Sequence, residues 1–109
     1  MEIRRIDEGY GASGQIQPSD VPVIQAMGYR TILCLRPDDE DEGDQPLFES
    51  IAAAAEQNRV RAVHLPIASG GPDSGEQARF DALIGTLEGP VLAYCRGGGR
   101  AARLRGAPG

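Results

Sequence analysis

Apolar and polar positions follow each other along the chain in blocks that predict strands and helices in turn. Segments that we expect to form strands cover residues 2–6, 10–15, 31–35, 60–67 and 91–94, and of these 31–35 is a near-continuous apolar run. Apolar residues recur at helical spacing over residues 18–27, 46–58 and 76–88, and residues 100–105 allow at most a short fourth helix. This alternation predicts an α/β fold in three layers (αβα), with a mainly parallel central sheet of about four to five strands.

Three loops of this predicted fold leave the carboxyl ends of strands. They are Arg36–Asp38, Ala68–Asp73 and Cys95–Arg100. In open α/β sheets the ligand crevice lies beyond those strand ends, so we expect the three loops to converge on one site.

The size and composition of the chain limit the classes of protein to which it can belong. Its 109 residues predict a single domain, 1–109, and the absence of tryptophan leaves a core of mainly Ala, Val, Ile and Leu. No run of about 18 apolar residues is present, and the N-terminus lacks the apolar stretch of a signal peptide. We therefore expect a cytoplasmic protein that does not enter a membrane, and its oligomeric state stays open.

Charge is distributed unevenly along the chain. All eleven basic residues are arginines, and residues 91–109 carry four of them without an acid, although the net charge is −5. Six acids crowd into positions 38–44 and predict a solvated surface loop. Nucleic acid is a poor partner for such a chain, whereas a local arginine-only segment suits a small anion. Two cysteines, one histidine and no Cys-x-x-Cys pattern predict no metal site, and we expect no cofactor.

The segment from Cys95 to Arg100 carries the strongest chemical signal. It delivers a cysteine from an apolar strand into the loop Cys-Arg-Gly-Gly-Gly-Arg. A thiolate is a nucleophile, and neighbouring arginines and backbone N–H groups favour that anionic form. Gly97, Gly98 and Gly99 let the backbone turn tightly around an oxyanion, and Arg96 and Arg100 supply positive charge. The segment predicts an anion-binding cysteine loop, although a buried Cys and a glycine turn can also be purely structural.

Other candidate residues have both a functional and a structural interpretation. Arg36 can bind substrate at the rim of the site or pair with an acid at the end of its strand. Asp73 can act as a general acid or cap a helix. Cys34 can form a disulfide with an oxidised Cys95, but a buried core thiol is the favoured interpretation. His64 is expected to be a packed residue rather than a base.

The chain resembles a known family in several short motifs that occur in order. Ser13-Gly14-Gln15, Arg36-Pro37-Asp38, His64-Leu65-Pro66-Ile67 and Val91 to Arg100 are similar to the phosphatase-like domains of beta-lactamase hydrolase-like proteins. These domains, also described as sulfur transferase domains, resemble dual-specificity and tyrosine phosphatases in fold. The resemblance implies that Cys95 is the nucleophile of a phosphatase-like hydrolase and that Arg100 binds the oxyanion.

This chain also departs from the pattern of that family. Members usually carry Ser and Thr in place of Gly97 and Gly99 and Ser in place of Ala101, and their last helix runs longer. The missing hydroxyls imply lower activity, and the early stop at Gly106 raises the alternative of a domain shortened at its C-terminus.

Three functions are compatible with the sequence. A phosphatase would act on a small oxyanion or phosphorylated substrate, and the fold of the family favours it. A rhodanese-like sulfurtransferase would take sulfur from a sulfane-sulfur donor as a Cys95 persulfide. The four residues between Cys95 and Arg100 favour it, because tyrosine phosphatases have five. A non-catalytic oxyanion-binding module is the third alternative.

Overall fold

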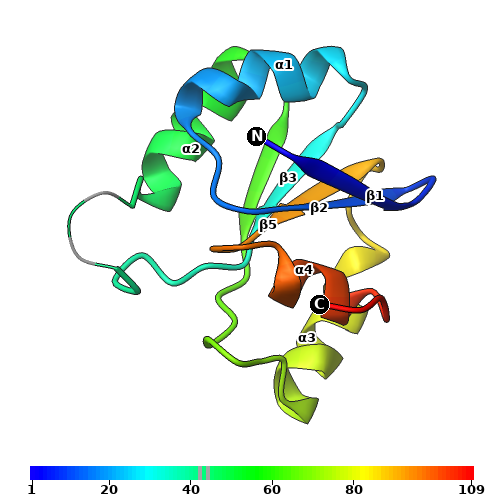
Figure 1. The fold of residues 1–109 in the computed structure, drawn as a ribbon. Helices are drawn as coiled ribbons and strands as arrows, with labels where there is room; N and C mark the ends of the chain where they lie inside the picture. The colour runs from blue at the N-terminus through cyan, green and yellow to red at the C-terminus, as the bar shows by residue number, and fades with distance from the viewer. Residues whose placement is uncertain (42, 44) are drawn as a thin grey trace.

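The computed structural model describes residues 1–41, 43 and 45–109 as one sheet with helices on both sides (Figure 1). Its elements are β1 (Ile3–Asp7), β2 (Tyr10–Ser13), a 3-10 turn η1 (Pro18–Asp20), α1 (Val21–Ala26), β3 (Thr31–Cys34), α2 (Phe48–Gln57), β4 (Arg61–His64), α3 (Ser74–Ile84), β5 (Val91–Tyr94) and α4 (Gly99–Leu104). No helix in the described ranges is both long and apolar enough to cross a membrane.

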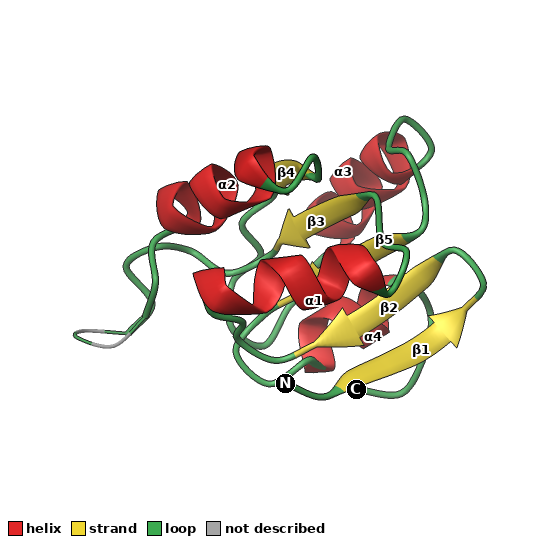
Figure 2. Ribbon diagram, turned by 90° about the horizontal axis from the view of Figure 1, so that it is seen from above, coloured by secondary structure: helices red, strands yellow, loops and turns green. Residues whose placement is uncertain are grey.

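The five strands lie side by side in the order β1-β2-β5-β3-β4 (Figure 2). β2, β5, β3 and β4 are parallel, and β1 joins the edge of the sheet as the antiparallel arm of a hairpin with β2. Cys34 of β3 lies opposite both His64 of β4 and Tyr94 of β5. The parallel strands thus end at the same edge of the sheet, as predicted, and β5 occupies its middle.

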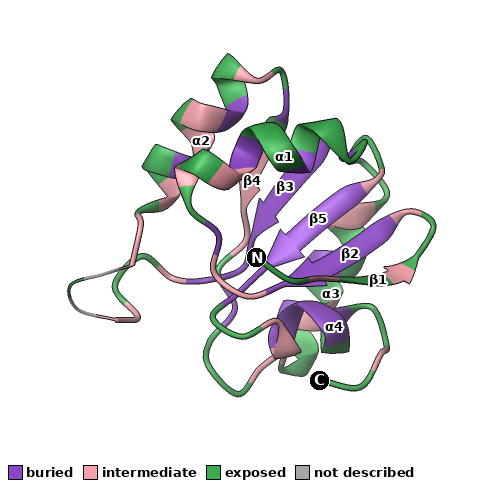
Figure 3. Ribbon diagram, turned by 45° about the horizontal axis from the view of Figure 1, so that its top comes forward, coloured by how far each residue is buried: buried purple, intermediate pink, exposed green. Residues whose placement is uncertain are grey.

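Helices cover both faces of the sheet and form two separate apolar cores. α1 and α2 pack on one face, where Ile24 and Ile51 meet Leu92 of β5. α3 and α4 pack on the other face, where Phe80 and Leu104 meet Ala93. The three central strands β2, β5 and β3 are buried, and β1 is largely exposed (Figure 3). The predicted three-layer α/β architecture is confirmed.

Several predicted element boundaries differ from the structure by a few residues, as at the end of α3, which the sequence places at residue 88 and the structure at Ile84, and two of the differences have identifiable reasons. The strand predicted over 60–67 ends at His64, since Pro66 has no N–H for the sheet, although Ile67 still donates to the Leu35 carbonyl. The helix predicted over 76–88 begins at Ser74 because Asp73 caps it and Glu76 returns a hydrogen bond to the Asp73 backbone.

Candidate active site

Cys95 follows the last residue of the central strand β5. Its N–H donates to the carbonyl of Ser13 at 3.1 Å, which fixes the start of the loop against the end of β2. Its sulfur accepts a hydrogen bond from the N–H of Gly98 at 3.1 Å. The loop therefore turns back on itself, so that a backbone donor points at the thiol, as the glycine-rich sequence predicts.

Gly98 gives the loop its shape. Its φ of +93° lies in the left-handed region, and it is the residue from which α4 begins. The two residues before Gly98 are held against the chain that follows β2. Gly97 forms an isolated antiparallel β-bridge with Gly14, and the N–H of Gln15 donates to the Arg96 carbonyl. At Gly97, by contrast, an added Cβ would meet no atom within 4 Å.

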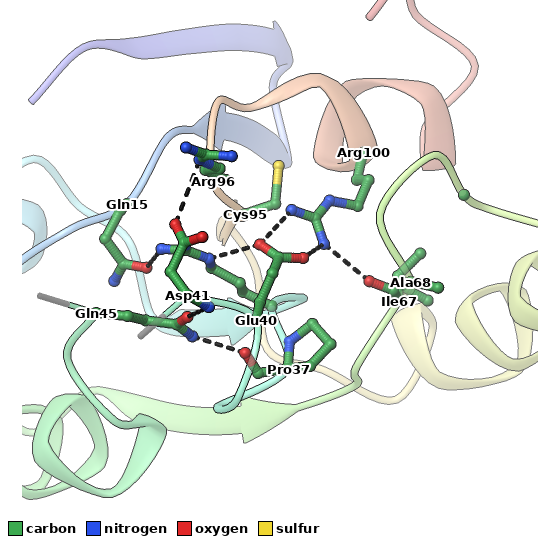
Figure 4. Close-up of polar contacts among 12 residues, drawn as sticks. Gln15, Pro37, Glu40, Asp41, Gln45, Ile67, Ala68, Cys95, Arg96 and Arg100 are labelled. Atoms are coloured by element: carbon green, nitrogen blue, oxygen red, sulfur yellow. Dashed lines mark hydrogen bonds and ion pairs between the residues drawn. The ribbon is translucent and has the colours of Figure 1, made fainter. Parts of the chain in front are cut away.

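Arg100 lies in the first turn of α4 and is buried. Its Nη1 donates to Glu40 Oε1 at 2.5 Å and to the Ile67 carbonyl at 2.9 Å, and its Nη2 donates to Glu40 Oε2 at 2.9 Å (Figure 4). The hydrogen bond with Glu40 raises the pKa of Arg100 against the effect of burial. The loops after β3, β4 and β5 therefore meet at this guanidinium, and the predicted convergence is confirmed.

Arg36 contacts the same carboxylate and is 3% exposed. Its Nε donates to Glu40 Oε2 at 2.6 Å, its Nη1 to Gln15 Oε1 at 2.8 Å, and its Nη2 to Asp41. Asp41 also pairs with Nε of the exposed Arg96 at 3.4 Å. Of the two roles considered for Arg36, pairing with acids is the one that these contacts show.

The prediction that the acidic segment 38–44 is a solvated surface is wrong for Glu40, whose side chain is only 13% exposed. A buried arginine needs a negative charge nearby, and the Glu40 carboxylate forms an ion pair with both Arg36 and Arg100. Asp38 is also engaged, since it accepts a hydrogen bond from the first N–H of α2. Glu42 and Asp44 lie outside the described residues. Sequence reasoning missed Glu40, although a surplus of arginines at strand ends could have suggested an acidic partner.

Asp73 precedes α3 in the loop that follows β4. Its Oδ1 accepts a hydrogen bond from the N–H of Glu76 at 2.7 Å, which confirms the helix-cap interpretation. Glu76 in turn accepts hydrogen bonds from the N–H groups of Asp73 and Ala68. Arg103 of α4 donates to the Gly71 carbonyl. The loop is thus fastened from two helices, and the role of Asp73 as a general acid stays a prediction.

Cys34 and His64 have the structural roles that were favoured for them. Both cysteines are free and buried, but they belong to the cores on opposite faces of the sheet. This placement gives a Cys34–Cys95 disulfide no support. Burial raises the pKa of the Cys34 thiol, which donates to the Arg36 carbonyl. His64 bonds the same carbonyl through Nε2 and stacks on Phe48. Among the described residues, no three His, Cys, Asp or Glu side chains are grouped to hold a metal ion.

Comparison with known proteins identifies relatives of this site and fold. A beta-lactamase hydrolase-like protein of Agrobacterium fabrum is 32% identical over 95% of this chain, and one of Xylella fastidiosa is 34% identical over the same share. The chain spans 24% of the length of these relatives. A solved structure of a candidate phosphatase from Neisseria meningitidis superposes with a TM-score of 0.85 at 39% identity, covering 94% of this chain and 72% of that one.

More distant structures show the same fold. The core catalytic domain of the Saccharomyces cerevisiae PP-IP phosphatase SIW14 superposes over 95% of this chain and 62% of its own, with a TM-score of 0.70 at 14% identity. The tyrosine-phosphatase-like fold expected from the sequence is therefore confirmed. The family model of the phosphatase-like domain of beta-lactamase hydrolase-like proteins matches residues 2–107, and the chain belongs to this family.

Proposed function

We propose that this domain is a cysteine-dependent phosphatase-like hydrolase that acts on a small oxyanion or phosphorylated substrate. The observation that carries the proposal is the single turn that unites Cys95, the N–H of Gly98 and Arg100. The sulfur would attack phosphorus, while Arg100 and the N–H groups of Gly97, Gly98 and Gly99 hold the non-bridging oxygens. Arg96, exposed at the mouth of the loop, would draw the anion in.

The reaction would proceed in two displacements. In the first, the sulfur–phosphorus bond forms as the bond from phosphorus to the leaving oxygen breaks, and that oxygen takes a proton. Asp73 is the acid that the loop after β4 offers for this transfer. In the second, water attacks phosphorus, its proton leaves, and the Cys95 thiolate and inorganic phosphate are released.

A sulfurtransferase is the second candidate, and the spacing of four residues between Cys95 and Arg100 favours it. In that reaction Cys95 would accept a sulfane sulfur as a persulfide and pass it to a thiol acceptor. It needs no general acid, so it assigns Asp73 only its capping role.

One experiment separates the candidates. Purified protein is assayed with an aryl phosphate and, separately, with thiosulfate plus cyanide, beside Cys95→Ser and the control Cys34→Ala. Phosphate release that is lost only in Cys95→Ser supports the proposal. Thiocyanate formation without phosphate release would overturn it in favour of sulfur transfer. Binding of phosphate with neither activity would leave an oxyanion-binding module.

A further inference from the structure

The guanidinium of Arg100 uses only part of its donor set in this structure. The Glu40 carboxylate spans the edge between Nη1 and Nη2, and the Ile67 carbonyl accepts a second hydrogen bond from Nη1. Among the described residues, neither Nε nor the second N–H of Nη2 donates to an oxygen atom, and the neighbouring group on that side is the sulfur of Cys95. A guanidinium can bind one anion across Nη1 and Nη2 and another across Nε and Nη2. One such edge of Arg100 is therefore taken, and one is available.

The available edge lies on the side of the cysteine. Figure 4 shows the Cys95 sulfur beside the Arg100 guanidinium, above the Glu40 carboxylate. The hydrogen bond with Glu40 is the largest cause that raises the pKa of Arg100, and the neighbouring Cys95 raises it by a smaller amount. An oxyanion bound between Nε and Nη2 would thus lie near the sulfur that has to attack it.

Glu40 in turn has a fixed position. Its Oε2 accepts from Arg36 Nε at 2.6 Å as well as from Arg100 Nη2 at 2.9 Å. Arg36 is held on its other side by Gln15 and Asp41. All three nitrogens of Arg36 have partners, and its side chain is only 4% exposed. Arg36 therefore contacts the site through Glu40.

We propose that Arg36 and Glu40 are positioning residues, which hold Arg100 so that its Nε edge faces the oxyanion at Cys95. This inference rests on the proposed function, because it concerns how the same oxyanion is bound. Arg36, which the sequence predicted as a substrate-binding residue, is thereby assigned the role of holding Arg100, the arginine that is proposed to bind the oxyanion. Gln15, which follows β2, completes the support by fixing Arg36.

A competing interpretation makes Glu40 an internal mimic of the substrate that blocks the arginine. The contacts favour positioning, since Glu40 binds the Nη1–Nη2 edge and shares an oxygen with Arg36. The two interpretations predict opposite effects of removing the charge. Loss of a positioning carboxylate weakens oxyanion binding, whereas loss of a competing carboxylate strengthens it.

Titration with inorganic phosphate tests the inference without requiring catalysis. The backbone amide signals of Gly97 and Gly99 are followed by NMR in the wild-type protein, Glu40→Gln, Arg36→Lys and Asp7→Asn. Asp7 is the matched control, because it pairs with Arg105 through both oxygens far from the loop. We expect Glu40→Gln and Arg36→Lys to raise the Kd for phosphate about tenfold and Asp7→Asn to leave it unchanged.

Tighter binding by Glu40→Gln would show that Glu40 competes with the anion, and unchanged binding would show that Arg100 is placed without it. Either result overturns the inference, as does a wild-type protein that binds no phosphate. If Glu40→Gln loses its folded spectrum, Glu40→Asp, which keeps the charge but shortens the side chain, is expected to weaken binding in the same direction. A wild-type protein that binds phosphate without hydrolysing an aryl phosphate contradicts only the proposed function.

A double-mutant cycle tests whether Glu40 acts through Arg100. In an Arg100→Lys background the bidentate pair is already lost, so Glu40→Gln should change the Kd for phosphate by less than about twofold. The same tenfold effect in both backgrounds would mean that Glu40 acts through another group and would overturn the assignment.

Discussion

The ends of β3 and β5 are neighbours in the sheet, and each carries a free, buried cysteine, yet their surroundings differ. Cys34, the last residue of β3, lies in the core under α1 and α2, and its thiol donates a hydrogen bond to the Arg36 carbonyl. After β5, the chain turns through Gly98, which places an N–H on the Cys95 sulfur and Arg100 beside it. Burial alone therefore does not separate a core thiol from a candidate nucleophile; the turn that follows the strand does.

The two strand ends are also linked, since Glu40 of the loop after β3 binds Arg100 of the helix after β5. The β3 end supplies support and the β5 end supplies the proposed chemistry. A substitution at β3 should therefore alter stability or binding, and one at β5 should alter turnover.

Replacing each cysteine gives the largest contrast. We expect Cys95→Ser to lower turnover of an aryl phosphate at least about a thousandfold, because a serine hydroxyl is a poor substitute for a thiolate. Cys34→Ala should keep turnover within about twofold and lower the free energy of unfolding by about 1 kcal/mol, for the lost packing of one sulfur. Initial rates and urea unfolding measure both effects. Equal losses of turnover in the two variants would contradict the distinction between the strand ends.

Asp73→Asn tests whether the end of β4 contributes chemistry. Asparagine caps a helix about as well as aspartate, so stability should stay within about 0.5 kcal/mol. As the proposed general acid, Asp73 should matter for a leaving group that needs a proton, and kcat for phenyl phosphate should fall about a hundredfold.

An activated ester such as nitrophenyl phosphate serves as the control, because its leaving group depends less on protonation. An unchanged kcat for both esters would mean that Asp73 only caps α3. The residues of the site would then come from the ends of β3 and β5 alone.

Gly98→Ala and Gly97→Ala test what shapes the turn after β5. The left-handed φ of Gly98 makes alanine there cost about 1–2 kcal/mol of stability. Gly97 has open space around its missing Cβ, so alanine there should change stability by less than about 0.5 kcal/mol. Urea denaturation compares the two variants. A cost at Gly97 as large as at Gly98 would mean that the loop is shaped by crowding rather than by backbone conformation.

Acid should weaken the link between the two strand ends. Hydrogen bonds from Arg100 and Arg36 hold the pKa of Glu40 below its ordinary value of 4.5. A lowered folded-state pKa adds stability that is present above 4.5 and is lost as the pH falls through the folded value. Unfolding free energies at about pH 6 and about pH 3 should therefore differ less in Glu40→Gln than in the wild-type protein.

Asp7, whose pKa Arg105 lowers, titrates in the same direction, but that pair is more exposed and should contribute less. An acid sensitivity that is identical in Glu40→Gln and the wild-type protein would show that the link between β3 and β5 adds nothing to stability.

Local pattern predicted the architecture and the cysteine loop well, for physical reasons. The apolar run before Cys95 and the glycines after it determine a buried strand and a tight turn without reference to distant residues. The pairing of Arg36 and Arg100 with Glu40 could not be read in the same way. It depends on which of six adjacent acids faces inward, and the tertiary placement of the loop decides that.

The place of β5 in the sheet has a consequence for how the molecule is made. β5 is the last of the five strands of this sheet to be synthesised, yet it lies between β2 and β3 and joins the two parts of the sheet. Until residues 91–94 emerge, the hairpin β1–β2 and the pair β3–β4 have no shared partner strand and no complete core. The sheet closes in the same step that places Cys95 at the start of its loop, so during synthesis the candidate nucleophile and the complete sheet should come into existence together.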